Sequence, residues 1–121
     1  MCATGSAPPP PVAESVRFTR AAGNMLSVTY DAASCSAQNV IVLYNALGAW
    51  NGYAACAQPD GGNSGSTMVD STGQENVWYN LVWTSGGVAG HPGFATSGAR
   101  TWTVGTLCGI SADDHERTTC P

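Results

Sequence analysis

Apolar and polar residues alternate with a period of two along much of this chain, and the apolar residues do not recur at helical spacing. In residues 24–32, Leu26, Val28 and Tyr30 share one face, and the polar residues between them occupy the other. Successive side chains of a β-strand point to opposite faces of its sheet. The pattern therefore predicts a strand with one buried face.

Residues 38–47, QNVIVLYNAL, are β-branched and almost continuously apolar. Such a run is typical of a central strand that is buried on both faces. Shorter runs bounded by turn residues predict further strands. These lie at residues 14–20, 52–57, 67–72 and 94–104, the last one broken near Gly98.

Residues 75–85, ENVWYNLVWTS, are the most aromatic stretch and predict a second central strand. We expect Tyr79, Leu81 and Trp83 to form its inward face, with Trp78 outward. The opposite choice would bury Asn80, whose amide would then need hydrogen-bond partners in the core.

Turn residues separate these strands. Asn51-Gly52 predicts a two-residue type I′ turn, residues 58–66 a Gly-rich loop, and residues 86–93 a turn or bulge. Residues 111–117 are the one candidate for a helical turn, with Ser111 as its N-cap.

Seven short strands at this spacing predict an all-β fold, a seven-stranded antiparallel sandwich of the immunoglobulin or fibronectin III kind, stabilised by disulfides. The expected core consists of Leu26, Val28, Tyr30, Val40, Val42, Tyr44, Leu81 and Trp83.

The chain divides into a proline-rich linker or tether, residues 1–11, and one β-sandwich domain with a C-terminal disulfide loop, residues 12–121. Pro8 to Pro11 favour a semi-rigid polyproline II segment.

The charged residues limit the classes of partner that the chain can bind. The chain has no lysine, four arginines and eight acids, a net charge of −4. Nucleic acid is excluded, because binding it depends on Lys and Arg contacts to phosphates. No apolar run approaches the roughly 20 residues of a membrane span, so no direct membrane insertion is expected. Protein is the expected partner, and a glycan is the alternative.

Five cysteines in so short a chain indicate an oxidising compartment, so we expect a secreted or cell-surface protein, extracellular or periplasmic. We expect Cys35, Cys56, Cys108 and Cys120 to form two disulfides. The preferred pairing joins Cys35 to Cys56 and Cys108 to Cys120, and the two other pairings stay open. Cys2 is left over, either as a lipid anchor or as a free or intermolecular thiol.

The order of several motifs resembles fibronectin type III-like domains, of the cysteine-bearing kind found in secreted deltaproteobacterial proteins. Tyr30 stands where such domains usually carry Trp. The motifs are PPPPVAESVRF, LSVTYDA, VIVLY, Gly52-Tyr53 with Cys56, Thr67 with Asp70, WYNLVW, GFATSGAR and the terminal Cys120-Pro121. The resemblance implies a non-catalytic spacer, adhesive or assembly role. The two cysteines near the C-terminus also resemble, more weakly, the disulfide loop of type IV pilins.

Reactive groups are few. Ser64 in GNSGS suggests a nucleophile loop, but that chemistry needs a base, for which only His91 and His115 are present. Residues 113–116, DDHE, are an unfavourable metal site, because adjacent side chains rarely converge on one ion. We therefore expect no enzyme, no catalytic residue, no metal and no cofactor.

Trp50, Tyr53, Trp78 and Trp102 are candidates for a protein interface or for stacking on sugar rings, and the remaining alternative is that they pack as core. We expect a non-catalytic extracellular module, a repeat, cap or subunit of a bacterial surface protein or of a pilus-like appendage. The alternatives are a carbohydrate-binding module and a small serine hydrolase. No lysine and few prolines guard the first and last strands, so self-association or docking through a sheet edge or an exposed tryptophan is expected.

Overall fold

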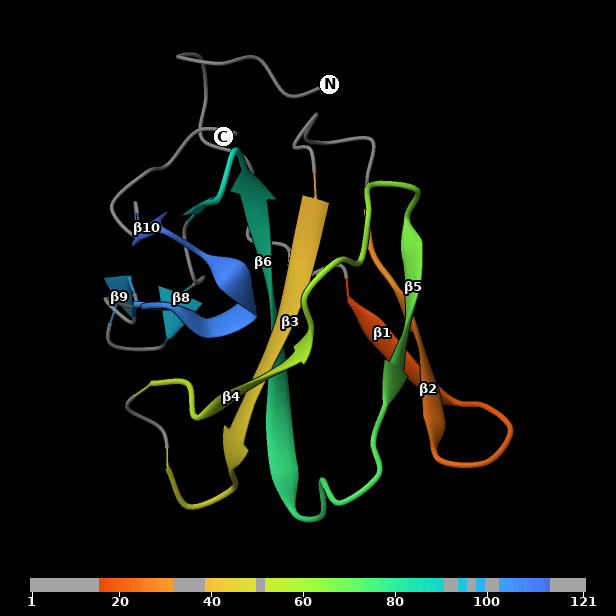
Figure 1. Cartoon of the computed structure of the whole chain (residues 1–121). Helices are drawn as coiled ribbons and strands as arrows, with labels where there is room; N and C mark the ends of the chain where they lie inside the picture. The colour runs from red at the N-terminus through yellow and green to blue at the C-terminus, as the bar shows by residue number, and fades with distance from the viewer. Residues whose placement is uncertain are drawn as a thin grey trace.

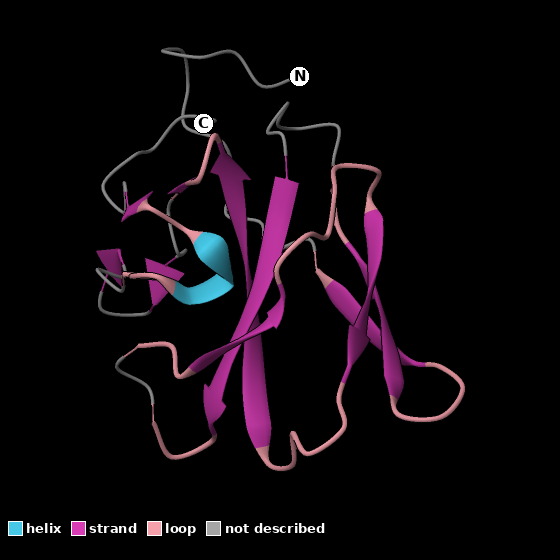
Figure 2. Cartoon of the chain, in the orientation of Figure 1, coloured by secondary structure: helices cyan, strands magenta, loops and turns pink. Residues whose placement is uncertain are grey.

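The computed structural model of the chain describes residues 16–31, 39–49, 52–90, 94–95, 98–99 and 103–113. This part of the chain is all-β (Figure 1), and its one helical element is a short 3-10 turn, η1, at Leu107–Gly109 (Figure 2). Within these ranges no helix is long and apolar enough to cross a membrane.

The first sheet has three antiparallel strands in the order β1-β2-β5. These are β1 (Arg17–Arg20), β2 (Met25–Thr29) and β5 (Ser66–Asp70). The alternation in β2 has the expected outcome, because Val28 is fully buried while Thr29 is exposed.

The second sheet has the order β10-β7-β6-β3-β4. Four of its strands are antiparallel neighbours, and β10 pairs in parallel with β7. The strands are β3 (Asn39–Ala46), β4 (Ala55–Gln58), β6 (Val77–Ser85), β7 (Val88–Ala89) and β10 (Ala112–Asp113). Two further strands, β8 (Phe94–Ala95) and β9 (Gly98–Ala99), pair with each other.

The two sheets pack face to face through one core, with β1, β2 and β5 to the right of β3 and β6 in Figure 1. Tyr30 closes one end of this core, and its hydroxyl donates to the carbonyl oxygen of Gly62 over 3.0 Å. Of the eight expected core residues, Leu26 and Tyr44 are half-buried and the rest are buried. The buried cluster is Val28, Tyr30, Val40, Val42, Val69, Leu81 and Trp83.

The outer face of the second sheet is also covered, as the apolar run at residues 38–47 predicts. Residues 104–110, which we call the strap, cross this face and include η1 (Figure 1, blue). Val104 and Ile110 of the strap are buried there. The cluster beneath and within the strap is Ile41, Leu43, Val82, Ala89, Val104 and Ile110.

The expected inward face of β6 is correct, but the strap removes the reason for that expectation, the exposure of Asn80. Tyr79, Leu81 and Trp83 do face the first sheet, but Asn80 is also buried, with 4% of its surface exposed. Its amide nitrogen donates to the Tyr53 hydroxyl over 2.8 Å. A buried amide is tolerated here because this partner compensates for the lost hydration.

The C-terminal third differs most from the prediction. Residues 111–117 do not begin a helical turn: Ser111 donates its backbone N–H to the carbonyl oxygen of Gly87, and strand β10 follows. Residues 86–93 contain strand β7, which a two-residue turn at Gly86-Gly87 joins to β6. Both glycines have positive φ, 59° and 79°, as a type I′ hairpin turn requires.

Other turn and strand predictions also change. Residues 94–104 do not form one last strand, because β8 and β9 pair separately. The connection from β3 to β4 runs from residue 47 to residue 54, and Asn51 of the expected turn lies outside the described residues. The described part of the chain therefore has ten strands, and the expected number of seven is too low.

A disulfide joins Cys56 of β4 to Cys108 of the strap, with a Cα–Cα distance of 5.3 Å. The preferred pairing of Cys35 with Cys56 and of Cys108 with Cys120 is therefore wrong. Each of these two bonds would require a cysteine that is already part of the Cys56–Cys108 disulfide. Cys2, Cys35 and Cys120 lie outside the described residues. The bond spans 52 residues, and closing a loop of that length stabilises a fold by about 4 kcal/mol.

Burial of both faces of the second sheet is testable with three leucines. Leu43→Ala, beneath the strap, should cost about 2–5 kcal/mol of unfolding free energy, as should Leu81→Ala in the inter-sheet core. Leu47→Ala is the matched control, because Leu47 is 48% exposed and should change stability by under about 0.5 kcal/mol. Urea unfolding of the oxidised protein measures all three. A Leu43→Ala cost as small as that of Leu47→Ala would contradict the strap's position.

Candidate interaction site

One edge of β6 is mostly unpaired within the part of the chain that the structure describes. On one side β6 pairs with β3 along eight residue pairs, but on the other side its ladder with β7 covers only Thr84 and Ser85. Beyond that ladder, the N–H of Gly90 donates to the carbonyl oxygen of Trp83 over 2.8 Å. No other strand of the described residues pairs with β6 on this side.

Strand alternation shows which backbone groups face this edge. The backbone groups of Trp83 point toward Gly90, so those of every second residue along β6 point the same way. These are Leu81, Tyr79 and Val77. Their N–H and carbonyl groups form a row at the spacing that another extended strand would match.

The sequence disfavours an extension of the β6–β7 ladder beyond Gly90. In a continued ladder, residue 92 would stand opposite Leu81 and would have to donate its N–H to the Leu81 carbonyl. Residue 92 is proline, which has no N–H to donate.

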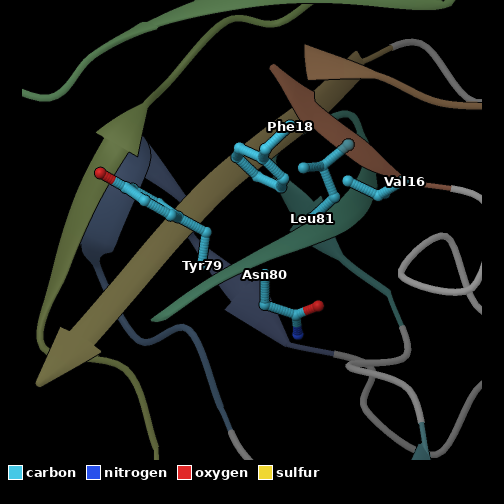
Figure 3. Close-up of a pocket in the computed structure, with 5 residues that line it drawn as sticks. All are labelled: Val16, Phe18, Tyr79, Asn80 and Leu81. Carbon is cyan, nitrogen blue, oxygen red and sulfur yellow. The ribbon is translucent and has the colours of Figure 1, made fainter. Parts of the chain in front are cut away.

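A pocket of about 170 Å³ lies beside this edge, between β1 and β6, and is lined by Val16, Phe18, Tyr79, Asn80 and Leu81. Figure 3 shows Val16, Phe18 and Leu81 close together, with Tyr79 beside them and Asn80 on the opposite side of β6. Alternation explains this division, because Tyr79 and Leu81 point between the sheets while Asn80 points toward the strap.

Phe18 and Tyr79 form the rim of the pocket. Their rings stack at a centroid distance of 5.2 Å with an interplanar angle of 21°, and Phe18 remains 36% exposed. The Tyr79 hydroxyl donates to the side-chain oxygen of Gln74 over 2.7 Å. The ring and the hydroxyl of Tyr79 are therefore both held by neighbouring side chains. The exposed part of Phe18 is the apolar surface that a partner would contact.

Tyrosines around the site are held in their neutral form. Burial raises the pKa of Tyr79, and electrostatic repulsion from Tyr44 raises it further. Burial also raises the pKa of Tyr30, against backbone hydrogen bonds at Gly65 and Ser64.

A second hollow is polar and lies between the β1–β2 turn and the loop after β5. Its groups hydrogen-bond to one another: the Asn24 amide donates to the Thr72 hydroxyl, and the Ser71 hydroxyl donates to the Asn24 carbonyl. Hydrogen bonds from the side chain and backbone of Thr72 lower the pKa of Asp70. These pairs account for the loop's conformation without a ligand.

Of the four candidate aromatics, Tyr53 and Trp78 lie together, with a centroid distance of 5.9 Å and a tilt of 52°. The Trp78 indole N–H donates to the Ala49 carbonyl over 2.7 Å. Both rings are half-buried, and both polar atoms have partners within the protein. They pack at the end of the outer face, whereas Trp50 and Trp102 lie outside the described residues.

The candidate chemical groups are not brought together in the described part of the chain. The Ser64 hydroxyl donates to the Ser66 carbonyl in the loop before β5, and His91 and His115 lie outside that part. Asp113 ends β10, and residues 114–116 of the DDHE motif are outside it too. No cluster of three metal-ligating side chains occurs in the described ranges.

Neither a scan against protein-family models nor searches of curated proteins and of solved structures find a match to this chain. The site must therefore be interpreted from its own residues.

The open β6 edge and its pocket are what the sequence analysis missed, because it expected edges at the first and last strands. Two signals point to them. Gly86-Gly87 sets the register of the β6–β7 hairpin, and Pro92 then falls where the ladder needs a donor.

Amide hydrogen exchange tests the open edge. In the isolated domain, the amides of Tyr79 and Leu81 should exchange faster than those of Asn80 and Val82, which point toward β3. The physical reason is that only the second pair is hydrogen-bonded within the sheet. Residue-resolved exchange by NMR measures the alternation, and equal protection of all four amides would show that the edge is covered.

Alkaline pH should destabilise the fold through its buried tyrosines. A tyrosine whose folded pKa is raised contributes stability that is complete below the unfolded pKa of about 10 and is lost as pH rises through the folded pKa. Tyr79→Phe should therefore reduce the fall in unfolding free energy above about pH 10. Adding Tyr30→Phe should reduce it further. Denaturant unfolding at a series of pH values measures the slope, and an unchanged slope in both variants would refute the assignment.

Proposed function

We propose that this protein is a non-catalytic interaction module of a secreted or cell-surface protein, which docks an extended segment of a protein partner along the open edge of β6. One observation carries the proposal: no strand of the described residues pairs with the backbone row at Val77, Tyr79 and Leu81, and a pocket lies directly beside this row.

The chemistry of the edge fits an extended peptide. Backbone N–H and carbonyl groups at strand spacing are satisfied by another strand, and pockets beside the edge select its alternate side chains. A partner residue opposite Tyr79 or Leu81 would share their face and would point into the pocket. β6 contains no charged residue from Val77 to Ser85, so an added strand meets no unpaired charge along it.

We propose a fibronectin type III-like identity for the domain. Two antiparallel groups with the orders β1-β2-β5 and β7-β6-β3-β4 support it, because immunoglobulin-like sandwiches divide their strands in this way. The Tyr79 hydroxyl, bonded to a residue five positions upstream, is similar to the tyrosine corner of such sandwiches. The role as a repeat, cap or subunit of a surface assembly follows from this resemblance.

The disulfide supports the proposed compartment. A bond between Cys56 and Cys108 persists in oxidising environments, such as the periplasm or the cell exterior.

The alternatives have less support. Tyr53 and Trp78 use their polar atoms inside the protein, which favours packing over stacking on a sugar. The hydrolase alternative needs a base beside Ser64, whose hydroxyl donates to a backbone carbonyl.

A charge placed at the pocket tests the proposal. Phe18→Lys puts a charge at the rim of the pocket, and natural sheet edges use such charges to prevent pairing. Met68→Lys is the matched control, because Met68 is 40% exposed on β5, in the other edge strand of the first sheet. Sedimentation at high micromolar concentration measures self-association, and crosslinking on the native surface tests for another partner.

We expect Phe18→Lys to weaken association by about tenfold or more, whereas Met68→Lys leaves it unchanged. A domain that stays monomeric and yields no crosslinked partner would contradict the proposal. Equal effects of the two substitutions would place any interface elsewhere.

A further inference from the structure

The inter-sheet core and the strap are separable parts of the fold. The core between the sheets contains residues of β2, β3, β5 and β6 and no residue of the strap. The strap belongs to the second cluster, on the other face of β3 and β6. Loss of the strap would therefore leave the contacts between the two sheets in place.

Buried side chains and backbone hydrogen bonds hold the strap and the residues that follow it. Val104 and Ile110 are its buried side chains, while Gly105, Thr106 and Gly109 are exposed. Beyond the strap, the chain is held at Gly87, where the Ser111 N–H donates to the carbonyl oxygen over 2.9 Å, and by the two-residue pairing of β10 with β7. The Cys56–Cys108 bond is the one covalent link between the strap and the sheet among these residues.

The backbone at the bond forms a tight turn. Cys108 has φ 56° and ψ 22°, a left-handed conformation that residues other than glycine rarely adopt. Gly109 follows with φ 74°, and the Ile110 N–H donates to the Leu107 carbonyl oxygen across these two residues over 3.1 Å. Gly105 has φ 65°, so the chain before this turn can reorient without steric cost.

We propose that the Cys56–Cys108 disulfide is a redox-sensitive latch, whose reduction releases the strap from the outer face of the second sheet while the two sheets stay packed. Both cysteines are only partly buried, so a dithiol reductant has access to the sulfurs. The reductant's thiolate attacks one sulfur and forms a mixed disulfide, and its second thiol then displaces that cysteine. Two electrons and two protons pass to Cys56 and Cys108, which become thiols, and the reductant becomes a disulfide.

Release would uncover an apolar surface on the sheet. Ile41, Leu43 and Val82 are at most 1% exposed beneath the strap, and no charged side chain belongs to their cluster. Exposed apolar patches of this kind mark interaction surfaces. The latch is thus independent of the β6 edge, because it controls the exposure of the outer face of the second sheet.

The test compares the methyl groups on the two faces of the sheet. A soluble paramagnetic agent broadens the NMR signals of methyl groups that solvent reaches. The outer set is Ile41, Leu43 and Val82, and the inner set is Val40, Val42 and Leu81. The full chain is measured oxidised, after reduction with dithiothreitol, and as the double variant Cys56→Ser with Cys108→Ser, which leaves the other cysteines unchanged.

We expect reduction and the double variant to increase the broadening of the outer methyl groups severalfold and to leave the inner ones shielded. Continued shielding of the outer set in a folded, reduced chain would overturn the proposal, because the strap would then stay in place without the bond. Exposure of both sets together, or failure of the double variant to fold, would also overturn it, because the bond would then hold the whole domain. Peptide mapping before and after reduction verifies which cysteines have reacted.

Discussion

Burial of β3 and β6 on both faces is the constraint on which the rest of the structure depends. Val40 and Val42 face the first sheet, and Ile41 and Leu43 face the strap, with all four at most 1% exposed. A strand that is apolar on both faces has to be covered twice. The first sheet covers one face, and the other requires the chain to return after β7 and lie across the sheet.

This requirement explains the features of the C-terminal region. The strap has one short 3-10 turn and two buried apolar side chains, and Leu107 packs against the same cluster. A covalent bond to β4 adds to these contacts. Within the described residues, β6 has only a two-residue ladder with β7 on the side away from β3.

The alternation of apolar and polar residues in the sequence predicted those parts of the fold in which apolar side chains are buried on one face of a strand. β2 and β6 show their inward residues directly in the sequence, and the continuous run of β3 indicates a strand buried on both faces. Val69 was missed because two adjacent residues of β5, Met68 and Val69, are apolar, and their pattern does not show which of them points inward. The prediction for the C-terminal third failed for a different reason. Ser111 and the acids after it favour the start of a helix, but a tertiary partner, the Gly87 carbonyl, binds the Ser111 N–H instead. Spacing along the chain also could not pair Cys56 with Cys108, since strap and β4 become neighbours only after the sheet has formed. The candidate site stayed hidden for the same reason, because the residues of its pocket come from β1 and β6.

The sequence distance across the disulfide has a consequence for how the chain is made. Synthesis proceeds from the N-terminus, and Cys108 follows every strand of both sheets except β10. The bond to Cys56 therefore cannot close until nearly the whole domain has emerged, and its geometry requires a sheet on which the strap can lie. Oxidation at this position marks a completed domain, so the thiol state of a newly made chain distinguishes finished copies from truncated ones.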